Sequence, residues 1–193
     1  MLRIASLVLL TGLLSATARA DWSLDNTHSR LSFVTTKAGA IAEVHHFGTL
    51  SGTVDGAGNV EITIDLATVD TMIPVRDDRM RQMLFQVAQF PTATIAAKID
   101  MVTLSGLDTG SSTMVDTDAQ VSLHGQTQTV PIQLVVAKLS SSRLLVTTVQ
   151  PVVVVASQFA LADGVEALRE VAGLPSISPA VPVSAVLSFE SKM

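Results

Sequence analysis

Residues 60–66 read VEITIDL, and hydrophobic and polar residues alternate strictly along this stretch. Successive side chains of a β-strand point to opposite faces, so the four aliphatic residues share one face and Glu61, Thr63 and Asp65 share the other. A strand with one apolar face is typical of antiparallel sheets and barrels. The same alternation recurs along the chain, in residues 31–33, 119–123, 130–136 and 181–189.

Turn-forming sequences separate these runs and set the number of strands. They are rich in Gly, Asp, Asn and Ser, which favour turns, and they lie at residues 55–59, 105–112, 124–126 and 140–142. About eight strands fit between the turns, and no linker divides the chain. The sequence therefore predicts one all-β domain, a single antiparallel β-barrel of about eight strands.

Alternation alone does not indicate which face of a barrel points inward. A barrel that folds in water turns its apolar face inward, whereas an outer-membrane barrel turns that face toward lipid. Membrane barrels carry girdles of aromatic residues, but this chain has no Tyr, one Trp and only 4% aromatic residues. Composition therefore favours a barrel with an apolar interior that does not span a membrane.

Two short helical insertions interrupt the β pattern. The first is RDDRMRQMLF (residues 76–85), in which Met80, Met83 and Leu84 have the i, i+3, i+4 spacing of one helical face. The second covers residues 163–172 and has its own apolar stripe. We therefore expect two helices, each packed against the barrel through its apolar face.

Charged residues are expected to stabilise both helices. In the first helix, Asp77 and Arg81 have the i, i+4 spacing of an ion pair. In the second, Asp163 and Glu166 have the spacing of a capping box, which predicts a helix that begins at Asp163.

The first twenty residues have the pattern of an export signal. Arg3 precedes an apolar run from Ile4 to Leu14 that is too short to span a bilayer comfortably, and Ala18-Arg19-Ala20 is a small-x-small cleavage sequence. We expect residues 1–20 to be a signal peptide that is cut after Ala20. Residues 21–193 then form the barrel domain.

Charge and cysteine content exclude several classes of function. The chain has a net charge of −5 and no Cys. Nucleic-acid binding requires a basic surface, so an acidic chain is a poor candidate for it. Without Cys there are no disulfides, thiol chemistry or Cys-ligated metals, and the stability of the fold must come from its core.

The histidines raise the alternative of an enzyme. Asp25, His28 and Ser29 supply the residue types of a hydrolytic triad, but no G-x-S-x-G turn presents the serine. His45 and His46 are adjacent, so in a strand they face opposite sides and are poorly placed to share one ion. We expect structural or cavity-lining histidines and no metal or cofactor. A metal- or His-dependent hydrolase at Asp25, His28 and His46 stays an alternative.

The order of several motifs along the mature chain resembles the YceI-like family, which is also called the polyisoprenoid-binding family. The motifs are Trp22-x-x-Asp25-x-x-His28-Ser29-x-Leu31-x-Phe33, His46-Phe47, Gly52-x-Val54-Asp55, Ile64 to Thr71 (IDLATVDT), Arg76-Asp77, Phe85-x-Val87-x-x-Phe90-Pro91 and Val121-x-Leu123-His124-Gly125-x-Thr127.

The resemblance implies a lipocalin-like barrel with an elongated apolar cavity. Members of this family are typically exported to the periplasm, hold an isoprenoid or a similar lipid, and are regarded as carriers rather than enzymes. The expected ligand of this chain is therefore a polyisoprenoid, an isoprenoid quinone or a fatty-chain lipid.

Candidate ligand contacts follow from the first helix and the resemblance. We expect an apolar wall or lid, two barrel-lining aromatic residues, and a polar end that binds the head group. In that order the candidates are Met80, Met83, Leu84, Phe85 and Phe90, then Phe33 and Phe47, then Arg76 and His45, with Arg79 as an alternative to Arg76 at the head group.

A third reading makes the domain an envelope-stress interaction module whose core is filled with side chains. The second helix would then be a contact surface, or a plug for the end of the barrel away from the first helix. Transient contact with a membrane and formation of a homodimer are both compatible with the sequence.

Overall fold

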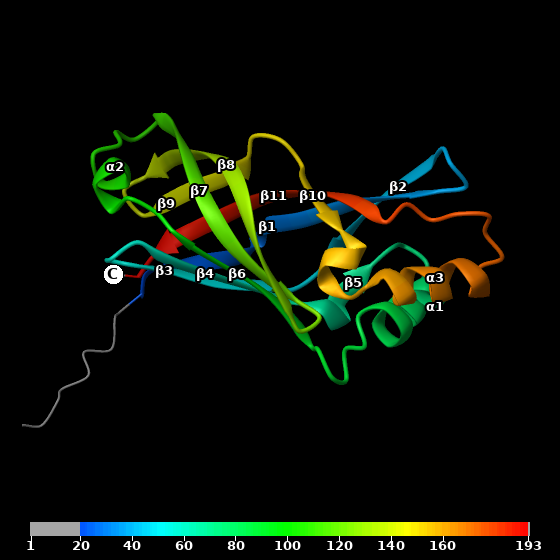
Figure 1. Ribbon diagram of the computed structural model, residues 1–193. Coiled ribbons are helices and arrows are strands. Elements are labelled where there is room, and N and C mark those ends of the chain that lie inside the picture. The colour runs from blue at the N-terminus through cyan, green and yellow to red at the C-terminus, as the bar shows by residue number, and fades with distance from the viewer. Residues whose placement is uncertain (1–19, 193) are drawn as a thin grey trace, which may run out of the picture.

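The computed structural model describes residues 20–192, which form one sheet of eleven antiparallel strands (Figure 1). Residues 1–19, which hold nearly all of the expected signal peptide, lie outside this range. The strands are β1 (Ala20–Lys37), β2 (Ile41–Phe47), β3 (Leu50–Asp55), β4 (Asn59–Asp65), β5 (Val69–Asp70), β6 (Thr92–Lys98), β7 (Ser112–Leu123), β8 (Gln126–Ser140), β9 (Arg143–Thr148), β10 (Val152–Val155) and β11 (Ala180–Ser191).

Eight of these strands close into a barrel. The order β1-β3-β4-β6-β7-β8-β9-β11 returns to β1, because β1 and β11 pair from Trp22 opposite Ser191 to Phe33 opposite Val183. The prediction of an eight-stranded antiparallel barrel is therefore confirmed. Strands β2 and β10 continue the sheet beside β1 and β11 at one end, and the short β5 pairs with β2.

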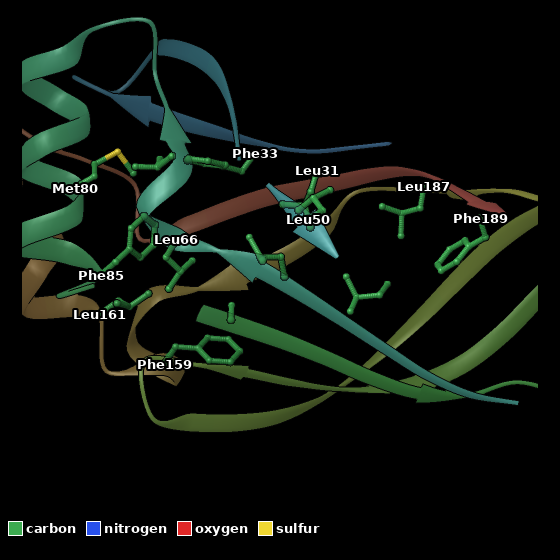
Figure 2. Packing of buried hydrophobic residues seen from close by; sticks show 14 of the residues in the cluster. Leu31, Phe33, Leu50, Leu66, Met80, Phe85, Phe159, Leu161, Leu187 and Phe189 are labelled. Atoms are coloured by element: carbon green, nitrogen blue, oxygen red, sulfur yellow. The ribbon is translucent and has the colours of Figure 1, made fainter. Parts of the chain in front are cut away.

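The apolar faces of the strands point into the barrel. In the VEITIDL stretch, Ile62, Ile64 and Leu66 are buried while Glu61 is exposed. Figure 2 shows buried residues from several strands, among them Leu187 and Phe189 of β11, gathered in one interior cluster. Sequence alternation therefore corresponds to a division between an apolar interior and a more polar outer surface.

The first predicted helix is present and contains a change of helical type. α1 (Pro74–Arg79) continues into the π-helical segment η2 (Met80–Leu84), in which the Phe85 N–H bonds to the Met80 carbonyl at 2.9 Å. An i to i+5 turn holds more residues than an α-helical turn. Met80, Leu84 and Phe85 therefore share the buried face.

The second predicted helix, α3 (Ala162–Val171), is present, but the predicted capping box is wrong. The helix starts after Leu161 and has no side-chain cap. Glu166 instead bonds to Arg169 one turn later, at 2.9 Å from Oε1 to Nε. The Glu166 carboxylate therefore accepts hydrogen bonds from Arg169 and not from the backbone N–H that the capping-box prediction gave as its donor.

The structure also corrects the expected position of α3 as a plug at the opposite end. α3 packs against η2, and Gly164 permits this approach because a Cβ there would lie 2.9 Å from the Met83 carbonyl oxygen. A helix that was not predicted, α2 (Met101–Ser105), lies at the other end of the barrel (Figure 1). Single turns η1 (Leu66–Thr68) and η3 (Ala156–Phe159) complete the fold.

Among residues 20–192, no helix has the length and apolar character needed to cross a membrane.

Asp77 has a different role from the predicted ion pair with Arg81. Its carboxylate is buried and accepts bonds from the Thr71 N–H at 2.8 Å and the Thr71 hydroxyl at 2.5 Å. Arg81 instead pairs with the exposed Asp78 at 2.6 Å. Asp77 thus ties α1 to the segment that follows β5.

Replacing Asp77 by Ala removes the acceptor of a buried N–H, so we expect the free energy of unfolding to fall by about 1–3 kcal/mol. Replacing the neighbouring Asp78 by Ala breaks only an exposed ion pair and should cost less than about 1 kcal/mol. Urea unfolding of the two variants measures the difference. Equal losses would contradict the anchoring role of Asp77.

Candidate functional site

The barrel encloses an elongated apolar cavity of about 580 Å³. Val181 and Phe189 of β11 both line it and lie eight residues apart, which corresponds to about 26 Å at about 3.3 Å per residue. The volume falls within the range of about 300–1,000 Å³ that is usual for ligand pockets. The cavity therefore has the length and volume for an extended chain.

Small residues on the inner face explain why the interior is not filled. Ala93, Ala97, Ala119 and Ala185 stand at lining positions on three of the barrel strands, β6, β7 and β11. An alanine leaves the volume of a larger aliphatic side chain unoccupied, and the aromatic content of the chain is low. The third reading, a domain with a filled core, is therefore contradicted.

The two ends of the cavity differ. Trp22, Ile99 and Leu104 line it near α2, and Leu104 is the buried residue of that helix. At the other end, called the mouth below, α1, α3 and the β1–β2 hairpin surround it. Ile73 and Val75 line the mouth and are also 42% and 56% exposed, so the cavity reaches the surface there.

A row of aromatic rings forms the wall beneath the mouth. The ring centroids of Phe33 and Phe47 are 5.3 Å apart, and those of Phe47 and Phe85 are 5.8 Å apart. His45 adds a further ring at 5.3 Å from Phe33. Met80 and Phe85 extend from the helical segment toward the barrel interior (Figure 2). The row therefore joins β1, β2 and the segment that follows α1.

The inner face of the β1–β2 hairpin becomes more polar toward the mouth. Leu31 pairs with Phe47, Phe33 with His45, and Thr35 with Glu43. Because side chains alternate along a strand, these pairs share the inner face and line the cavity together. Lys37 continues the same face of β1. The sequence of one hairpin thus places a polar group at one end of an apolar tube.

Three cations and one carboxylate meet at this polar end. The Glu43 carboxylate oxygen Oε2 is 2.7 Å from Lys37 Nζ and 2.6 Å from Arg76 Nη1. A hydrogen bond from Lys37 and a second from Arg76 hold the pKa of Glu43 below its ordinary value, against the opposing effect of burial. Arg79 lines the cavity nearby and has no ion pair among residues 20–192.

Two buried polar atoms near this cluster have no partner within the described chain, Arg76 Nε and His45 Nδ1. Arg76 is held in place by Glu43 and by the Thr71 carbonyl, at 2.6 Å from its Nη2. His45 Nε2 lies 2.9 Å from the Thr35 hydroxyl. The arrangement leaves an N–H of Arg76 and a ring nitrogen of His45 available to a polar group that enters the cavity.

The structure places seven of the nine sequence-predicted contacts in the cavity wall. They are Phe33, His45, Phe47, Arg76, Met80, Leu84 and Phe85. Met83 is outside the lining because the π-helical turn rotates it away from the face of Met80 and Leu84. Phe90 is also outside it, since its ring packs on His124 at 4.3 Å between centroids. Met83 and Phe90 are therefore predicted contacts that do not line the cavity.

Sequence reasoning missed Lys37 and Glu43. Lys37 and Glu43 continue the alternation that runs through Phe33 and His45, so extending the strands toward the turn would have placed both on the inner face. Arg79, the alternative to Arg76 at the head group, lines the cavity as Arg76 does.

The residues of the hydrolase alternative do not form one site. His28 is bonded to Asp25 at 2.6 Å, but its side chain is 58% exposed and outside the cavity lining. The Ser29 hydroxyl donates to the Asp25 carbonyl and accepts the Ser188 N–H. His46 lies 3.7 Å from Asp70 on the outer face of β2. The Ser29 hydroxyl is thus engaged with the backbone rather than with His28.

No group of three or more His, Asp or Glu residues suited to hold a metal ion occurs in the described part of the chain.

The fold and cavity define a closed antiparallel barrel with an internal ligand pocket, and comparison with known proteins specifies its family. The YceI-like domain model matches residues 22–189, so the chain belongs to this family. No match was found among curated proteins.

Solved structures that resemble this chain include a polyisoprenoid-binding domain from Saccharophagus degradans implicated in plant cell wall breakdown. It is 38% identical, with a TM-score of 0.89 over 90% of this chain and 100% of that one. Burkholderia cenocepacia BcnA is 17% identical, with a TM-score of 0.65 over 86% and 98% of the two chains. A Campylobacter jejuni YCEI protein is 13% identical, with a TM-score of 0.57 over 77% and 85%. The last two likenesses concern the fold alone.

The environment of His45 predicts a pH dependence of stability. Burial, and then the charge of Arg76, hold the pKa of His45 below its ordinary value of 6.5. As the pH falls below 6.5, His45 is protonated more readily in the unfolded chain than in the folded chain. The free energy of unfolding therefore decreases by up to about 1.4 kcal/mol for each unit by which the pH is lowered. Above pH 6.5 this contribution is constant. The lowered pKa of Glu43 also decreases stability as the pH falls, but only below pH 4.5.

Replacing His45 by Gln should flatten this dependence, whatever it does to stability at neutral pH. Urea unfolding of the parent protein and the variant between about pH 5 and pH 8 measures it. Two curves that run parallel over this range would contradict the assignment to His45.

Proposed function

We propose that this protein is a carrier that holds one long apolar chain, namely a polyisoprenoid, an isoprenoid quinone or a fatty-chain lipid, inside the barrel. The observation that carries the proposal is the elongated apolar cavity that ends in a charged cluster. A binding role agrees with membership of the YceI-like family and with the polyisoprenoid binding of the Saccharophagus degradans domain.

The energetics of chain burial support binding at useful affinity. Ten methylene-sized groups transferred from water to the cavity contribute about 8 kcal/mol at about 0.8 kcal/mol each. Loss of free motion on association costs several kcal/mol of this gain. Affinity is then micromolar or better, with weak selectivity, because one methylene group changes binding by only about 1–3 kcal/mol.

The charged cluster determines the orientation of the chain and the chemistry of its head group. Lys37, Arg76 and Arg79 carry three positive charges in the cavity wall, where Glu43 is the one carboxylate among the described lining residues. Arg76 Nε–H can only donate, so the head group must present an acceptor. An anionic head group such as a phosphate, held at the mouth with its chain in the barrel, satisfies both conditions.

The proposed place of action is the periplasm. Support comes from the signal-peptide pattern of residues 1–20 and from the usual location of the YceI-like family. A carrier in that compartment would shield an apolar chain from water.

Replacing Ala119 by Phe tests the cavity. Ala119 is 1% exposed and lines the middle of the barrel, so a phenyl ring there should occupy the path of the chain. We expect native mass spectrometry of the parent protein, purified from its source cells without detergent, to detect a bound lipid that the variant lacks. Replacing the exposed neighbour Gln120 by Phe is the matched control. A parent protein that carries no lipid and takes up no geranylgeranyl phosphate would overturn the carrier function.

Replacing Arg76 by Gln tests the head-group contact. A charge-assisted hydrogen bond is worth about 1.5–3 kcal/mol, so affinity for geranylgeranyl phosphate should fall about tenfold to a hundredfold. Affinity for geranylgeraniol, which has no charge, should change much less. Replacing Arg81 by Gln is the control, since Arg81 lies outside the cavity lining. Equal changes for both ligands would remove Arg76 from the head-group site.

A further inference from the structure

The mouth carries exposed apolar side chains that the fold does not cover. Ile41 and Val44 of β2 are 51% and 68% exposed, and Met72, Ile73 and Val75, in and before α1, are 81%, 42% and 56% exposed. The pairing of β2 with β5 and the ion pair of Arg76 with Glu43 hold these two segments together. These five residues are called the apolar rim below.

The apolar rim is continuous with the cavity. Ile73 and Val75 line the cavity as well as the outer surface, so apolar side chains extend from the interior past the mouth. An apolar chain leaving the barrel would therefore pass from the cavity wall directly onto the rim.

The backbone at Met72 displays its side chain at a conformational cost. Its φ of +63° is in the left-handed region, which is unfavourable for a residue with a side chain. The Asp70 carboxylate maintains this turn by accepting the Met72 N–H at 2.8 Å. A strained turn that leaves a large apolar side chain in water indicates a partner for that side chain.

The charges beside the rim indicate what this partner is. Lys37, Arg76 and Arg79 line the cavity at the mouth, and Glu43 is the one carboxylate among the described lining residues. Of the exposed carboxylates beside the rim, Asp78 pairs with Arg81 and Asp70 lies 3.7 Å from His46. Aliphatic side chains that enter the interface of a bilayer, next to cations that meet lipid phosphates, are the usual pattern of a peripheral membrane contact.

We propose that the apolar rim docks on a bilayer that contains anionic phospholipids, so that an apolar chain moves between bilayer and cavity without crossing water. This inference rests on the proposed carrier function, but it concerns a separate surface. A second copy of this chain is the competing occupant, because the outer edge of β2 is paired only at His46 and Phe47 in the described chain.

The test is flotation of the full mature chain with vesicles of phosphatidylethanolamine and phosphatidylglycerol. Replacing Val44 and Met72 together by Ser should weaken vesicle binding at least about tenfold. The matched control replaces Met114 and Leu139 by Ser; they are 56% and 49% exposed and belong to the parts of β7 and β8 beside the segment that follows α2, where Lys138 bonds to the Leu107 carbonyl. The control should bind like the parent protein, and binding to vesicles of phosphatidylcholine alone should be weaker.

Solution binding of geranylgeranyl phosphate separates this proposal from the carrier function. A parent protein that binds this ligand but not the vesicles would overturn docking and leave the carrier intact. One that binds vesicles but no apolar ligand would overturn the carrier and leave docking intact. Equal losses in both double variants would also overturn docking. So would a parent dimer that the rim variant converts to a monomer, because the rim would then be an interface between copies.

Discussion

The whole structure depends on closure of the sheet by β1 and β11 with the apolar face of every strand turned inward. Closure removes the free edges of an open sheet, which would otherwise expose unpaired backbone groups. Because alanines occupy several inner positions, the closed ring is not filled by its own side chains. The same alternation that makes the barrel fold therefore leaves an apolar volume inside it, and that volume is the basis of the function.

The chemistry at the mouth follows from the β1–β2 hairpin, which extends beyond the ring of eight strands. Its inner face proceeds from Leu31 and Phe33 to Thr35 and Lys37, so one strand supplies both the apolar wall and the polar end. Arg76 reaches the same point from α1 because Glu43 and the Thr71 carbonyl hold it. A ligand that enters tail first would meet apolar side chains along the tube and cations only at its end.

The strands and most of the cavity wall were predictable because a β-strand has a two-residue period. Phe33 and Phe47 were assigned to the interior from alternation and from resemblance to the YceI-like family, and their positions agree. Met83 lies outside the cavity lining because the helix changes to a π-helical turn at Met80, for which the sequence gives no warning. The capping-box prediction was wrong because Glu166 had a closer cationic partner. The sequence did not distinguish Arg76 from Arg79, because the orientation of each depends on helix packing against the barrel.

The most direct test of a hollow interior is a crystal structure of the protein purified from its source cells without detergent. The account predicts elongated electron density that extends from Arg76 and Lys37 at the mouth along the inner face of β11. A barrel whose inner side chains meet across the axis, with no volume left for a chain, would contradict it.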